Sequence, residues 1–464
     1  MTNKTSLHKG SVLIDLIIAL VLASLFIAMI ARNTSLARQT FDRAKIRSDA
    51  MSTDGILFAS STLRSGLYGN EFYQNEIDLG LGTTSQTNFS FIEPRHNSQD
   101  VQISSNGLCS VSFTYGKVQS ITPVLRKIHL PIDPNQNPTS LIVRNSIAYV
   151  SFDSALASDA DLAMFDIRDD EALLLARINT GPGIIDFVLV GKYLYAVSPS
   201  QVGQVHIIEE SGLDSLILKN RFKLPLPYAT ATPALGSAIA YANDLIFLGT
   251  QKWSGDEFNI LDIRNRQTPE KKAGYEVGSK VNRIFAYLDR VYASASNEQQ
   301  LLIFDIPSSS HSSDLPDDIQ PMAIFSPDGW MRQEGRAISL FENRLKFGRT
   351  SGGFDLANEH EYFEFDTNSS TTFQNNQSQN QKGGVYDIVE DKLFTYFVSR
   401  ENDKEFYVIR NEDREFIAST SERSIFTFSL PIIPERMACY LDKIYILAKQ
   451  APFIYELNFK SNDQ

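Results

Sequence analysis

Few side chains in this sequence of 464 residues have the types and spacing that catalysis or metal binding requires. It contains no P-loop, GxGxxG, GxSxG or HExxH motif. The acid-rich stretch with Asp153, Asp159, Asp161 and Asp166 lacks the glycine of an EF-hand calcium loop. No two histidines lie at metal-ligand spacing; they are His8, His96, His129, His206, His311 and His360. We therefore predict a protein that is not an enzyme and holds no metal or cofactor.

One carboxylate occupies a chemically costly position near the N-terminus. Asp15 is the single charged residue in the apolar run 11–31, SVLIDLIIALVLASLFIAMIA. As a helix this run would be about 31 Å long, enough to cross the hydrocarbon core of a bilayer. It is longer than the apolar region of a secretory signal peptide, and a carboxylate in a membrane needs a partner or a purpose. We predict a transmembrane anchor helix over 11–31 in which Asp15 has a function.

The residues around Asp15 resemble the N-terminal signature of type IV prepilins and pseudopilins. A short basic leader ends in Gly10, Ser11 follows it, and Asp15 is the fifth residue after Gly10. The resemblance implies that prepilin peptidase cleaves between Gly10 and Ser11 and that the new amine is methylated. It also implies that Asp15 pairs with an N-terminal amine during filament assembly, so that two buried charges compensate each other. Asp15 replaces the usual Glu, Ser11 the common Phe and Arg32 a frequent Pro, which favours a minor pilin or pseudopilin over a major subunit.

The region after the anchor leaves alternatives open. It holds more Lys and Arg than the leader, which runs against the positive-inside rule for a body outside the cytoplasm. Residues 32–65 have near-helical apolar spacing and no proline, as in a pilin helix that continues out of the membrane or in a plain stalk. We assign 1–10 to the leader, 32–65 to an extended stalk helix and 66–100 to a linker.

The composition bounds the rest of the chain. The formal net charge is -12, and no basic stripe interleaved with aromatic residues is present. Such an acidic body is repelled by phosphate backbones, so nucleic acid is not an expected partner. An aromatic content of 11% suits a β-rich globular body rather than a disordered chain.

From residue 139 onward the sequence repeats about every 50 residues, and each unit has a turn-forming pair followed by an apolar run. The pairs are Asn145-Ser146, Gly191-Lys192, Asn243-Asp244, Asp289-Arg290, Asn343-Arg344, Asp391-Lys392 and Asp442-Lys443. Asn, Asp and Gly suit the positive φ angles of tight hairpins. Seven units predict a mainly β fold, a seven-bladed β-propeller over 101–464; a stack of β-sandwich domains is the alternative.

A second apolar run in most units ends near an acid, and these acids are Asp166, Glu209, Asp262, Asp305 and Asp366. We expect them to cap turns rather than to catalyse a reaction. The fragments FDIR, LDIRNRQTPE and FDIP resemble LVIVD-type repeats of bacterial surface propellers. The polar stretches 308–318 and 367–384 read as low-complexity loops.

The last unit has no room for its outer strand, whereas the stretch 120–131 stands alone before the first repeat. We predict that 120–131 completes the seventh blade and closes the ring, which removes exposed sheet edges. The segment 101–117 would then pack near that blade and bring Cys109 close to Cys439. These are the two cysteines of the chain, and we predict a disulfide between them; two inert thiols are the alternative.

These features predict a single-pass bacterial membrane protein, a minor pilin or pseudopilin that displays its propeller outside the cytoplasm for adhesion or ligand recognition. Its expected partners are the membrane, prepilin peptidase, other subunits of a type IV pilus or related filament, and an extracellular ligand. One alternative is a membrane-tethered propeller enzyme, quinoprotein-like or a hydrolase, which would need convergent acids, histidines or a metal on the central channel. The other is a signal-anchored surface scaffold that never enters a filament.

Overall fold

The computed structural model describes most of residues 124–458 and three two-residue strands before them. Within 124–458 the undescribed residues are 134–135, 154–158, 213, 288, 307–317, 328–332, 342–343, 352–359, 368–374, 380, 382, 391–393, 403, 412–423, 431, 441–442 and 450. The leader (1–10), the anchor (11–31), the stalk (32–65) and most of the linker (66–100) lie outside the described residues, so these assignments stay predictions. Among the described residues no helix is long and apolar enough to cross a bilayer.

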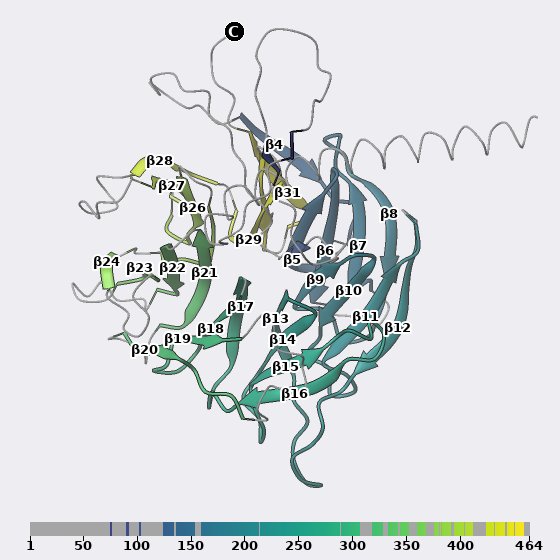
Figure 1. The fold of residues 1–464 in the computed structure, drawn as a ribbon. Coiled ribbons are helices and arrows are strands. Elements are labelled where there is room, and N and C mark those ends of the chain that lie inside the picture. Colours follow the sequence, from purple (N-terminus) through teal and green to yellow (C-terminus); the bar gives the residue numbers. More distant parts are fainter. Residues whose placement is uncertain are drawn as a thin grey trace, which may run out of the picture. The chain divides into compact units, whose positions relative to one another are not determined.

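The chain divides into two units, Met1–Arg95 and His96–Gln464. In the first unit the structure describes one antiparallel pair, β1 (Asn75–Glu76) with β2 (Ser90–Phe91). The second unit contains seven blades of four antiparallel strands arranged around a common centre, a seven-bladed β-propeller (Figure 1). This confirms the predicted fold of the body and excludes the stack of sandwiches.

Each blade runs from an inner strand at the centre to an outer strand at the rim. The inner strands are β5 (Asn137–Arg144), β9 (Asp186–Val190), β13 (Gly236–Ala242), β17 (Val281–Tyr287), β21 (Gly335–Phe341), β25 (Asp387–Glu390) and β29 (Pro434–Tyr440). The second strands are β6 (Ile147–Asp153), β10 (Tyr193–Val197), β14 (Leu245–Thr250), β18 (Arg290–Ala295), β22 (Arg344–Arg349), β26 (Phe394–Val398) and β30 (Lys443–Ala448). The third strands are β7 (Leu162–Asp166), β11 (Val205–Glu210), β15 (Phe258–Asp262), β19 (Leu301–Asp305), β23 (Tyr362–Asp366), β27 (Phe406–Arg410) and β31 (Phe453–Asn458). The outer strands are β8 (Leu173–Ile178), β12 (Leu216–Phe222), β16 (Glu270–Tyr275), β20 (Ala323–Phe325), β24 (Asn375–Gln379), β28 (Ser424–Phe428) and β4 (Val124–His129).

The ring closes with a strand from its N-terminal side. β4 pairs along its whole length with β31, from Val124 opposite Asn458 to His129 opposite Phe453. Ile128 of β4 is fully buried, and Arg126 forms a 2.7 Å ion pair with Glu456 of β31. Residues 124–129, within the predicted stretch 120–131, therefore supply the outer strand of the seventh blade, as the isolation of this stretch in the sequence suggested.

The hairpins between inner and second strands use the expected turn chemistry in the first three blades. Asn145, Ser146, Asn243 and Asp244 all have φ between 52° and 61°, and Gly191 has a φ of 60°. Positive φ at both central residues defines the turn type that matches the twist of a hairpin. The predicted pairs in these blades are confirmed.

In three later blades the predicted turn pairs are wrong by one residue. Arg290, Arg344 and Lys443 are the first residues of their second strands rather than turn residues. Each of them already pairs with the last residue of the inner strand: Arg290 with Tyr287, Arg344 with Phe341 and Lys443 with Tyr440. Backbone pairing therefore extends one residue further than predicted, and the hairpin turn ends before the basic residue.

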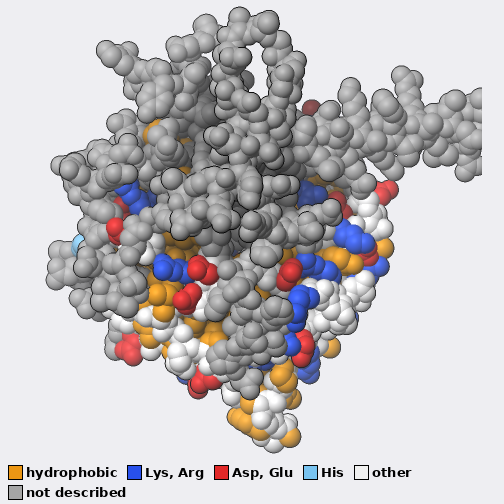
Figure 2. All heavy atoms as spheres, viewed as in Figure 1, with side chains coloured by type: hydrophobic (Ala, Val, Ile, Leu, Met, Phe, Trp, Pro, Cys, Tyr) orange, Lys and Arg blue, Asp and Glu red, His pale blue; other side chains and the backbone are white. Residues whose placement is uncertain are grey.

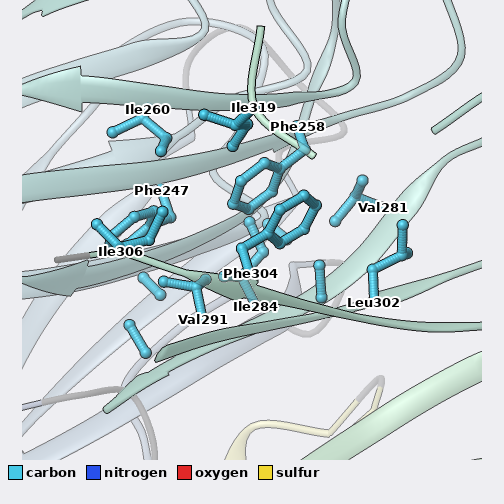
Figure 3. Packing of buried hydrophobic residues seen from close by; sticks show 14 of the residues in the cluster. Phe247, Phe258, Ile260, Val281, Ile284, Val291, Leu302, Phe304, Ile306 and Ile319 are labelled. Carbon is cyan, nitrogen blue, oxygen red and sulfur yellow. The ribbon is translucent and has the colours of Figure 1, made fainter. Parts of the chain in front are cut away.

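Apolar side chains fill the spaces between adjacent blades. The cluster between the third and fourth blades contains Phe247, Phe258, Val281 and Phe304 (Figure 3). The rings of Phe258 and Phe304 are parallel with centroids 4.3 Å apart, so the third and fourth blades are stacked through aromatic contact. Such packing positions the inner strands that line the centre.

The short strand β3 (Gln102–Ile103) adds to the inner edge of the second blade. It pairs with Leu189 and Val190, at the end of β9 opposite to Asp186. The predicted placement of 101–117 beside the seventh blade is therefore wrong for these two residues, because the free edge of β9 offers them backbone partners. The rest of that segment, Cys109 included, lies outside the described residues.

Candidate functional site in the central channel

The inner strands carry an equivalent residue five positions before each hairpin turn. In five blades it directly follows a β-bulge, whose extra residue is Thr139, Ser237, Asn282, Arg336 or Glu435. The seven equivalent residues are Ser140, Asp186, Ala238, Arg283, Ala337, Asp387 and Arg436. Four of them are charged although the strands around them are apolar, so this level of the channel is the polar centre of the ring.

Arg283 spans the channel at this level. Its Nη1 lies 3.4 Å from Asp186 in the second blade, and its Nη2 lies 3.6 Å from Asp387 in the sixth blade. The blades between them carry Ala238 and Ala337 at the equivalent position, which leaves space for the long side chain. The three charged side chains are at most 1% exposed. Since buried ions are tolerated only when paired, these contacts fasten three blades across the axis.

Further hydrogen bonds hold the two carboxylates. Ser140 Oγ donates a 2.6 Å hydrogen bond to Asp186, and the backbone N–H of Met437 donates a 2.8 Å hydrogen bond to Asp387. Burial lowers the pKa of Arg283, the nearby Arg436 lowers it further, and Asp387 and Asp186 oppose both effects. The arrangement is therefore a compensated ion cluster whose carboxylates are already engaged.

A second layer of charged residues lies at the end of the channel where the inner strands start. We call this layer, which contains Glu435, Arg336, Arg400 and Lys280, the channel mouth. Glu435 forms 2.7 Å ion pairs with both Arg336 of the fifth blade and Arg400 of the sixth. The Arg400 guanidinium also lies 3.8 Å from the centre of the Tyr386 ring. Burial works to raise the pKa of Glu435, but the guanidinium groups of Arg336, Arg436 and Arg400 outweigh it, and the pKa is lowered. Glu435 is thus an ionised bridge between blades.

Lys280 completes the channel mouth. It directly precedes β17, and its pKa is lowered first by burial and then by the neighbouring charge of Arg336. Glu334 works against this shift, and Arg436 reinforces it. Figure 2 shows that Lys and Arg side chains lie beside Asp and Glu side chains on the coloured surface of the propeller as well. The mouth itself combines closely spaced cations with few carboxylates.

The sequence alone did not reveal a convergent set of charged residues on the central channel. Acids and arginines do converge there, although no histidine is among the residues that form the two layers. The missed signal is positional: a charged residue stands five places before the hairpin turn in strands such as DFVLV and VNRIFAY. No group of three or more His, Cys, Asp or Glu that could hold a metal occurs among the described residues.

The predicted N-terminal site residues cannot be placed against this channel. Gly10, Ser11 and Asp15 lie outside the described residues. Cys439 is a buried, disulfide-bonded residue of β29. Its predicted partner, Cys109, lies outside the described part, so the identity of the pair stays a prediction.

The acid-rich stretch of the first blade is structural where the structure describes it. Asp161 accepts hydrogen bonds from Thr180 Oγ1 at 2.9 Å and from the backbone N–H of Gly181 at 2.8 Å, which anchors the connection to the second blade. Asp166 accepts a bond from the backbone N–H of Arg168, and Asp262 accepts the same bond from Arg264. The predicted turn-capping role is confirmed for Asp166 and Asp262.

Equivalent anchors recur in other blades, directly before the third strand. Gln204 accepts from the backbone of Leu224, Glu257 from Gly278, and Glu405 from Leu430, all at 2.8 to 2.9 Å. In these blades the acid or amide thus ties the third strand to the chain that enters the next blade. This position is not evident in the sequence because Gln, Asp and Glu alternate in it.

His206 is a fully buried histidine in β11 that packs opposite Arg221 of the outer strand. Burial lowers its pKa to about 4, with Arg221 acting in the same direction and Asp161 against it. The unfolded state therefore takes up the proton first, and stability is lost as the pH falls from about 6.5 towards 4. Between pH 7 and pH 4.5, we expect the free energy of unfolding of the unaltered protein to fall by about 2 kcal/mol more than that of a His206→Leu variant. Chemical denaturation of both proteins at the two pH values measures this, and equal losses would contradict it.

Comparisons with known proteins agree on the fold alone. No protein-family model matches the sequence, and no curated protein matches it significantly. Among solved structures, a catalytically inactive virginiamycin B lyase from Staphylococcus aureus, with quinupristin, superposes with a TM-score of 0.51 at 13% identity, over 73% of this chain and all of the lyase. A periplasmic gluconolactonase from Pseudomonas aeruginosa has a TM-score of 0.47 at 9% identity, over 66% of this chain and 97% of its own. The resemblances to LVIVD-type repeats and to type IV prepilins therefore stay predictions.

Proposed function

We propose that this protein is a membrane-anchored, pseudopilin-like protein that displays its seven-bladed propeller outside the cytoplasm for adhesion or ligand recognition. The observation that carries the proposal is Gly10-Ser11 followed by Asp15 inside a 21-residue apolar run (11–31). A long apolar helix accounts for membrane attachment, and the prepilin signature accounts for a carboxylate within it. Its partners would be prepilin peptidase, other pilin-like subunits and an extracellular ligand.

The propeller supports a display role through its rigidity. The ring is closed by β4, apolar clusters pack between neighbouring blades, and Arg283 fastens three blades across the channel. A rigid scaffold holds its connecting loops in fixed positions, which is what a recognition surface requires. The channel carboxylates Asp186, Asp387 and Glu435 are each ion-paired, which favours recognition over proton-transfer catalysis at this centre.

Substitution of Gly10 tests the proposed processing. We expect Gly10→Val to abolish cleavage, so that the protein keeps its leader of ten residues, because the peptidase must approach the backbone before the scissile bond closely. Intact mass of the membrane fraction measures the change, and His8→Gln is the matched control that should still be cleaved. Cleavage of the Gly10→Val protein at the same site as the unaltered protein would overturn the pseudopilin-like assignment.

Surface display is tested separately. Propeller residues of intact cells should be accessible to an externally added protease or antibody in the unaltered protein. Equal display of the Gly10→Val and unaltered proteins, without any cleavage in either, would instead identify a plain signal-anchored scaffold.

A further inference from the structure

The channel mouth, together with Arg436 at the adjoining level of Arg283, contains arginine donors that no described residue satisfies. The Nε atoms of Arg336, Arg400 and Arg436 are buried, and none has a hydrogen-bond partner in the part of the chain that the structure describes. These three residues come from the fifth, sixth and seventh blades and share the carboxylate of Glu435 as a neighbour. Buried donors of this kind need an acceptor, because an unsatisfied one costs about 1–3 kcal/mol.

Arg436 is the most exceptional of the three. It is only 5% exposed, and no hydrogen bond or ion pair within 4 Å joins its guanidinium to another described residue. By contrast, the equivalent residue of the fourth blade, Arg283, lies between two carboxylates. A buried guanidinium without a carboxylate is unfavourable unless a ligand supplies the charge.

The charged groups around Arg436 make its buried positive charge more unfavourable unless an anion binds. Its charge acts on Arg283 and on Lys280, in both cases disfavouring their protonated forms. Three nearby carboxylates are engaged elsewhere: Asp186 and Asp387 with Arg283, and Glu435 with Arg336 and Arg400. A fourth, Glu334, acts on Lys280. The channel mouth is therefore locally rich in cations on a chain whose overall formal charge is -12.

We propose that the channel mouth binds an oxyanion group of a ligand (carboxylate, phosphate or sulfate) through Arg436, Arg336 and Lys280. Arginine presents paired N–H donors that match the two oxygens of such a group, and Lys280 adds a single charged donor. The site faces the start of the inner strands, whereas β3 pairs at the other end of β9. It specifies the chemistry of the ligand in the proposed recognition role and does not depend on processing at Gly10.

Isothermal titration of the detergent-solubilised full chain with sodium phosphate, at constant ionic strength set with chloride, tests the site. We expect saturable binding, and an affinity at least about tenfold weaker in Arg436→Gln. Arg264→Gln is the matched control, since Arg264 lies on an outer turn and pairs with Asp262. A parallel titration with acetate distinguishes a phosphate-like group from a carboxylate, and saturation by either anion supports the proposal. Absence of saturation with both anions, or unchanged affinity in Arg436→Gln, would overturn it.

The thermal unfolding midpoint of the same proteins provides an independent measurement. Without added anion, Arg436→Gln should be at least as stable as the unaltered protein, because a repulsive buried charge is removed; phosphate should raise the midpoint of the unaltered protein alone. If Arg436→Gln is instead destabilised, Lys280→Gln serves as the second variant, and its phosphate affinity must fall. A protein that binds phosphate but retains its leader would overturn the proposed function and leave this site intact.

Discussion

Replacement of Arg283 by methionine is expected to lower the free energy of unfolding by about 3–5 kcal/mol, because it leaves two buried carboxylates without a counter-ion. Asp186 and Asp387 are both fully buried and belong to blades on opposite sides of the fourth blade. Methionine has a similar length, so lost packing contributes little. Urea denaturation of the full chain in detergent, followed by tryptophan fluorescence, measures the change.

The triple variant Arg283→Met, Asp186→Asn, Asp387→Asn is the control for this result. It removes the cation and both anions together, and replacing a whole buried ion cluster costs far less than removing one member. We therefore expect it to recover most of the lost stability. A single variant that loses less than about 1 kcal/mol would show that Arg283 does not fasten the blades.

Replacement of Lys346 by methionine is expected to cost a similar amount, about 3–5 kcal/mol near pH 8. Lys346 in β22 forms an ion pair with Glu390 of β25, and both side chains are at most 2% exposed. Ser339 Oγ donates a further 2.8 Å hydrogen bond to Glu390. Removal of the ammonium group would leave a buried carboxylate with one neutral hydrogen-bond donor.

The stability that Lys346→Met loses relative to the unaltered protein should increase with pH. Burial raises the pKa of Glu390, the neighbouring Lys346 lowers it, and the charge of Glu364 raises it. A raised pKa means that the folded state binds the proton more tightly, so stability falls as the pH rises above the ordinary glutamate value of about 4.5. Without Lys346 this loss of stability grows. We therefore expect the free energy of unfolding of the variant to differ less from that of the unaltered protein at pH 5 than at pH 8. A deficit that is the same at both pH values, or larger at pH 5, would contradict this account, and Lys346→Met with Glu390→Gln should show no such dependence.

The sequence predicted those parts of the propeller that depend on local chemistry. Asn145 and Asn243 mark hairpin turns because few other residues accept positive φ, and Asp166 and Asp262 cap turns two residues away. The closing strand was recognisable because its fragment stood alone before the first repeat. The turn and capping signals lie within a few residues of the features that they predict. The closing strand instead followed from the missing outer strand of the last unit, and its Arg126 pairs with Glu456 over a separation of 330 residues.

The channel could not be predicted in the same way, because its contacts join residues far apart in the sequence. Arg283 and Asp186 are 97 residues apart, and they meet only because seven blades bring their inner strands to one axis. The register of the later turns was missed by one residue because Arg290 already pairs with Tyr287 of the inner strand, which the sequence pattern around Asp289 does not reveal. A single buried charge in an apolar inner strand becomes informative only when the blades are aligned on their turns.

The most direct test of the proposed function is the N-terminal sequence of the mature protein isolated from membranes, determined by mass spectrometry of its first peptide. The proposal predicts a chain that begins at Ser11 with a methylated amine and retains the apolar run with Asp15. A mature chain that still begins with the leader, or one cleaved after the apolar run, would contradict it.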